Sequence, residues 1–130
     1  MLRAEAARVA YEGRMADRRV AVFVSRGDPS TLRLAGSCAL ASAAAGDRVD
    51  VYLFGTAVRA VVAAHAGEPD DPAALFQQAR RAGACRVIAC SASVVEEKVD
   101  LAEAERALDA VVGWPTVLEW SRGVVDRFSF

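Results

Sequence analysis

The stretch Arg86-Val-Ile-Ala-Cys90-Ser-Ala-Ser93 decides the fold of this chain. It is a short β-branched apolar run that ends on a cysteine and passes directly into small hydroxyl residues. Such a run is typical of a parallel strand that helices cover on both faces. Ligands of open α/β sheets bind at the carboxyl ends of the strands, where Cys90 would lie. Cys90 is therefore either an accessible, reactive thiol or, as is commoner for free cysteine, a small buried apolar residue.

Further strands and helices alternate around this stretch. Apolar runs of strand length occur at 19–24, 49–54 and 111–112, and a more polar run at 124–130 has the composition of an edge strand. Helical patterns lie between them, at about 29–45, 58–64, 72–82, 100–107 and 116–121. The alternation predicts a single three-layer doubly wound α/β domain with a five-stranded, mostly parallel sheet. For this sheet we expect the flavodoxin-like strand order 2-1-3-4-5.

Three aspartates predict where helices begin. Asp28 precedes a proline, which is the usual combination of an N-cap with proline in the first turn. Asp100 is followed three residues later by Glu103, an acidic capping pattern. Asp71 also precedes a proline and predicts a third start, whereas residues 91–99 between the third strand and Asp100 are expected to form a loop.

Length, composition and charge restrict the class of protein. The 130 residues are 54% hydrophobic and 25% charged, which is typical of one soluble globular domain and excludes a disordered chain. We expect residues 18–130 to form this domain and residues 1–17 to be an N-terminal helical extension. A formal net charge of -1 favours neither nucleic acid nor a membrane as a partner.

The three cysteines are Cys38, Cys85 and Cys90. An odd number without a secretory signal pattern predicts a protein of the reducing cytoplasm and no disulfide framework. Cys85 and Cys90 should not bridge, because five residues of strand span roughly 16 Å and the two side chains point to opposite faces. Cys38 and Cys85 are thus expected to be packing residues. With one histidine, His65, and no close cysteine pair, no metal site is expected.

The predicted strand order places other polar groups beside Cys90. If the first and third strands are neighbours, their carboxyl ends form the topological switch point, where a ligand site is expected. This would bring Ser25, Arg26 and Gly27 close to Cys90, and the backbone of Ser91 and Ser93 would add N–H donors. A positive charge beside a cysteine stabilises the nucleophilic thiolate. The turn after the first strand lacks a glycine-rich phosphate loop, and no cofactor is expected.

Together these residues resemble the DsrE/DsrF-like family of small sulfur-relay proteins, which includes the TusBCD components. The matching segments are 20–27, 49–54, 83–93 and 111–113, and the resemblance extends over about residues 18–130. It implies a cysteine that carries a persulfide between a donor and an acceptor protein, as a sulfur carrier or a sulfurtransferase. Only Cys90 matches the position of that cysteine. The resemblance also implies a homo-oligomer, either a trimer or a hexamer.

Two other functions remain open. In the first, the chain is a non-catalytic oligomeric binding or scaffold protein, and Cys90 only fills space. In the second, Cys90 is a thiol redox sensor, which is less favoured because no second cysteine lies within reach to form a disulfide.

Overall fold

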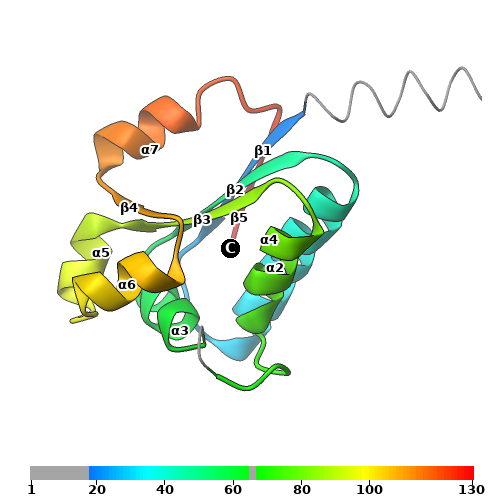
Figure 1. Ribbon diagram of the computed structural model, residues 1–130. Helices are drawn as coiled ribbons and strands as arrows, with labels where there is room; N and C mark the ends of the chain where they lie inside the picture. Colours follow the sequence, from blue (N-terminus) through cyan, green and yellow to red (C-terminus); the bar gives the residue numbers. More distant parts are fainter. Residues whose placement is uncertain (1–17, 65–66) are drawn as a thin grey trace, which may run out of the picture.

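The structure is a computed structural model that describes residues 18–64 and 67–130 (Figure 1). The predicted N-terminal extension at 1–17 and His65 lie outside the described residues. In chain order, the elements are β1 (Arg19–Val24), α2 (Pro29–Ala44), β2 (Arg48–Leu53), α3 (Thr56–Ala64), α4 (Ala74–Ala82), β3 (Cys85–Cys90), α5 (Ser91–Glu96), α6 (Leu101–Ala107), β4 (Ala110–Val112), α7 (Trp114–Trp120) and β5 (Asp126–Ser129).

The five strands form one sheet in which every neighbouring pair is parallel. Helices connect successive strands and lie on both faces of the sheet (Figure 1). The predicted fold class, a three-layer α/β domain with a five-stranded parallel sheet, is therefore confirmed.

The strand order is β4-β3-β2-β1-β5, so β2 lies between β1 and β3. The expected order 2-1-3-4-5 puts β1 directly beside β3, and the observed pairings of β2 with both strands correct it. In that expected order β2 would be an edge strand, yet Val51, Tyr52 and Leu53 are almost completely buried. An apolar run of this kind shows that a strand is interior but does not identify its neighbours.

One face of the sheet carries most of the hydrophobic core. Its helical cover comes from α2, α3, α4, α5 and α6, because successive right-handed crossovers from β1 to β4 step in one direction along the sheet. Alternate residues of the three central strands point into this core: Val20, Val22, Val24, Val49, Val51, Leu53, Cys85, Val87 and Ala89. Figure 1 shows α2 and α4 side by side on this face.

The opposite face is covered by α7, which connects β4 to β5 across the sheet, and we call it the α7 face (Figure 1). Its buried cluster consists of Ala21, Tyr52, Ile88 and Val117. Val117 is the one buried side chain of α7 itself. The cover on this face is accordingly much thinner than on the other.

Local signals in the sequence determine the starts of two helices. Asp28 accepts a hydrogen bond from the Thr31 amide at 3.1 Å, and Asp100 accepts one from the Glu103 amide at 3.1 Å, as predicted. Asp71 instead accepts a bond from the Ala73 amide, and α4 begins at Ala74. The expected loop at 91–99 begins with the short helix α5. Within the described residues, every helix is too short or too polar to cross a membrane.

The contact between α2 and α4 depends on a glycine. A Cβ atom added to Gly36 would lie 2.6 Å from the Cβ of Leu75, well inside normal contact distance. The two helix backbones approach each other closely because this position has no side chain.

We therefore expect Gly36→Val to lower the free energy of unfolding by about 1–3 kcal/mol, since overpacking forces the two helices apart. The matched control is Ser37→Val, which introduces the same β-branched residue at the next, exposed position of α2. Urea unfolding followed by circular dichroism measures both changes. Equal losses in the two variants would show that helix propensity, not the contact with α4, is responsible.

Candidate functional site

Cys90 is the last residue of β3 and lies directly before α5. Since side chains alternate along a strand, Cys90 points to the same face as Ile88, which is the α7 face. It is paired with Val112 of β4, and only 4% of its surface is exposed. The predicted position at the carboxyl end of a central strand is correct, but the thiol is covered.

Two stacked aromatic rings cross the end of β3 on the α7 face. Phe54 follows β2 and Trp114 begins α7 just after β4, and their ring centroids are 4.9 Å apart. Because β3 lies between β2 and β4, this pair spans the carboxyl end of the strand that carries Cys90. Trp114 itself is 52% exposed, so the outer ring of this pair is open to solvent.

The two serines after Cys90 differ in their surroundings. Ser93 is buried, and its Oγ accepts a hydrogen bond from the Gly55 amide at 2.9 Å. This bond ties α5 to the turn after β2. Ser91 is exposed at the start of α5. Ser93 thus has a structural partner, whereas Ser91 is open to a molecule approaching the end of β3.

The turn after β1 is not next to Cys90, contrary to expectation. The intervening strand β2 separates the ends of β1 and β3 by roughly 10 Å, two strand spacings. The Arg26 side chain is 74% exposed and lies 3.9 Å from Asp28. Ser25 donates its hydroxyl to the Phe130 carbonyl at 3.0 Å, and the Gly27 amide donates to the Thr56 hydroxyl at 2.9 Å. These contacts fix the turn near β5 and α3.

The other two cysteines have surroundings that suppress thiol chemistry. Cys85 is buried at the amino end of β3, and burial, with smaller contributions from Asp109 and Asp50, raises its pKa to about 12. Burial also raises the pKa of Cys38, which packs against the core from α2. All three cysteines are free. The expectation that Cys38 and Cys85 are packing residues agrees with these positions.

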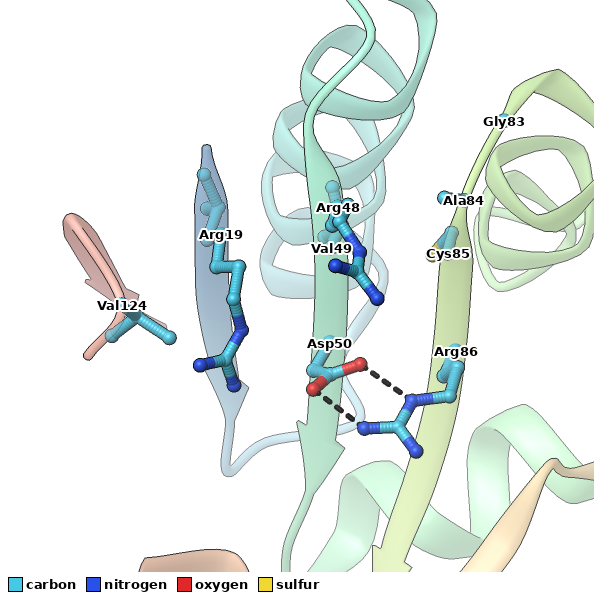
Figure 2. A pocket seen from close by; sticks show the side chains of 10 residues that line it. Arg19, Arg48, Val49, Asp50, Gly83, Ala84, Cys85, Arg86 and Val124 are labelled. Carbon is cyan, nitrogen blue, oxygen red and sulfur yellow. Dashed lines mark hydrogen bonds and ion pairs between the residues drawn. The ribbon is translucent and has the colours of Figure 1, made fainter. Parts of the chain in front are cut away.

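A second polar cluster lies at the amino ends of the central strands and was not found from the sequence. Arg19, Arg48, Asp50 and Arg86 come from β1, β2 and β3, and Figure 2 shows their side chains above the same side of the sheet. Arginines at or near the start of three strands were visible in the sequence. Only the register between the strands, however, brings these residues together.

Comparisons with known proteins agree with this fold. The model of the DsrE/DsrF-like family matches residues 18–121. The crystal structure of the YchN protein from E. coli is similar with a TM-score of 0.59 and 15% sequence identity, over 88% of this chain and 99% of that chain. At this identity the likeness shows a shared fold. The search of curated proteins found no match.

We expect Cys85 to resist alkylation in the native protein at about pH 8, because a thiol with a pKa of about 12 is almost entirely protonated there. In urea, Cys85 should react as an ordinary cysteine. Peptide mass spectrometry after a short exposure to iodoacetamide measures the modification of each cysteine. Rapid native labelling of Cys85 would contradict its assignment as a packing residue.

Proposed function

We propose that this chain, which belongs to the DsrE/DsrF-like family, relays sulfane sulfur as a persulfide on Cys90. The observation that carries the proposal is the position of Cys90 at the carboxyl end of an interior parallel strand, inside the segment that the family model matches. Of the three cysteines, it alone stands at this end of the sheet, where α/β proteins bind their ligands.

The chemistry requires one thiolate on this chain. The Cys90 thiolate attacks the outer sulfur of a donor protein's persulfide, and a new sulfur–sulfur bond forms on Cys90. The donor's sulfur–sulfur bond breaks, and the donor leaves as a thiolate, so the exchange needs no external oxidant or reductant. An acceptor thiolate then removes the sulfur from Cys90 by the same reaction. Cys38 and Cys85 take no part in it.

The burial of Cys90 adds a condition to this proposal. A thiol that is 4% exposed must be uncovered before another protein's persulfide can reach it. The stacked Phe54 and Trp114 rings, at the junction of β4 and α7, are the groups whose displacement would open the carboxyl end of β3. We therefore assign the first turn of α7 as the gate of the sulfur site.

The proposed partners are a sulfur donor, a sulfur acceptor and further copies of this chain. Large apolar side chains remain exposed on α7, at Trp114 and Leu118, and at the sheet edge, at Val125 just before β5 and at Phe128 on β5. A second copy packed on the α7 face would cover Trp114 and Leu118, whereas Phe128, in register with Val22, points to the opposite face of the sheet. The proposed compartment is the cytoplasm, where three free thiols stay reduced.

The same burial favours one alternative function. If Cys90 is never uncovered, it serves as packing, and the chain is a non-catalytic oligomeric binding or scaffold protein. The two functions differ in whether Cys90 exchanges sulfur in the native state, which can be measured directly.

After incubation with a persulfide donor, we expect the native protein to gain one sulfur on Cys90, detected by intact-protein and peptide mass spectrometry. Cys90→Ser should gain none, and Cys38→Ser should load as the wild type does. Trp114→Ala should load faster, because the ring that covers the end of β3 is absent. Circular dichroism verifies that each variant is folded.

Two outcomes of this experiment contradict the carrier function. One is equal loading of the wild type and Cys90→Ser. The other is a Cys90 that stays unloaded in both the wild type and Trp114→Ala while it loads in urea, and this second result supports the scaffold function.

We expect sedimentation velocity to give a mass three or six times that of the 13.8 kDa chain. Leu118→Glu should shift the protein toward the monomer, because it places a charge in the proposed contact surface. Arg33→Glu, an exposed change on α2 on the opposite face, is the control and should leave the mass unchanged. A monomer at all concentrations would contradict the homo-oligomer.

A further inference from the structure

A groove of about 640 Å³ opens at the amino ends of β1, β2 and β3, at the other end of the strands from Cys90. Its charged lining comes from Arg19, Arg48, Asp50 and Arg86, which lie on the α7 face (Figure 2). The distance from Cys85 to Cys90 along β3 is roughly 16 Å, so this groove is separate from the proposed sulfur site.

Arg86 is held rigidly at one side of the groove. Its Nε and Nη2 donate to the two carboxylate oxygens of Asp50 at 2.8 and 2.9 Å. Its guanidinium carbon lies 4.5 Å from the centre of the Trp120 ring, a cation–π contact. A bidentate ion pair and an aromatic ring together fix the position of this guanidinium.

Arg19 is also fixed, but its charge is not neutralised by its contacts. Its Nη1 donates to the Arg122 carbonyl at 2.8 Å, and its Nη2 donates to the Trp120 carbonyl. Both acceptors are neutral backbone groups at the end of α7. Arg19 therefore brings a positioned positive charge to the opposite side of the groove.

Arg48 lies between these two arginines, and Figure 2 shows its guanidinium above the sheet near Arg19 and Asp50. Among the described residues, its side chain makes no hydrogen bond or ion pair. Three guanidinium groups thus line the groove together with one carboxylate, and that carboxylate is engaged by Arg86. Two positive charges remain for a bound molecule.

We propose that this groove binds a phosphate group, either free or carried on a small organic molecule. Guanidinium groups match phosphate oxygens in charge and geometry, and two unneutralised arginines suit a doubly charged phosphate. The volume lies within the usual range for small-molecule pockets and exceeds the space that phosphate alone fills. Arg19 and Arg48 contact the anion, while Arg86 and Asp50 form the wall beside it.

Isothermal titration calorimetry on the full chain at low salt tests this site with ribose 5-phosphate, inorganic phosphate and ribose. We expect both phosphate probes to bind and ribose not to bind. Arg48→Gln should weaken phosphate binding about tenfold, the loss expected for one hydrogen bond to a charged group. Arg33→Gln, which removes an exposed arginine on α2, is the matched control and should bind as the wild type does.

The two phosphate probes distinguish the source of the phosphate group. Tighter binding of ribose 5-phosphate assigns an organic ligand, and equal affinities assign free phosphate. The site is contradicted if neither probe binds at millimolar concentration, if ribose binds as well as ribose 5-phosphate, or if Arg48→Gln binds as the wild type does. Cys90→Ser should keep full phosphate binding, so failure of the sulfur-relay proposal and failure of this one are separate results.

Discussion

The row of valines across the three central strands is the constraint on which the rest of the structure depends. Val22, Val51 and Val87 are in register and completely buried against the helices of the thicker layer. A shift of one residue in any of these strands would turn its apolar side chains to the opposite face. This register makes the carboxyl ends of β1, β2 and β3 level, and it places Phe54 beside the end of the strand that carries Cys90.

The two faces of the sheet have divided roles. Five helices pack on one face, and the apolar side chains that point there serve stability. The α7 face receives Cys90, the aromatic rings near it and, at the opposite end of the strands, the arginine groove. The residues proposed for sulfur transfer and for phosphate binding lie on this face, which one short helix covers.

Much of the fold follows from local sequence patterns. The apolar runs and the capping residues Asp28 and Asp100 identify strands and helix starts because the interactions involved are local. The strand order cannot be read from these local patterns, since apolar runs of similar composition pair equally well with several neighbouring strands. This is why Arg26 was expected next to Cys90 although β2 lies between their strands. The arginine groove was missed for the same reason, because Arg19, Arg48 and Arg86 meet only through the register.

The thin attachment of α7 has a consequence for the dynamics of the protein. Regions with few buried apolar contacts open locally at a free energy far below that of global unfolding. Val117 is the one buried side chain of α7, and contacts of Arg19 and Arg86 with Trp120 hold its carboxyl end, so we expect α7 to open from its first turn while the valine row keeps its hydrogen bonds. Amide hydrogens of α7 would then exchange with solvent in native protein much faster than those of β2. The cover over Cys90 thus opens at a lower free energy than the sheet that carries this thiol.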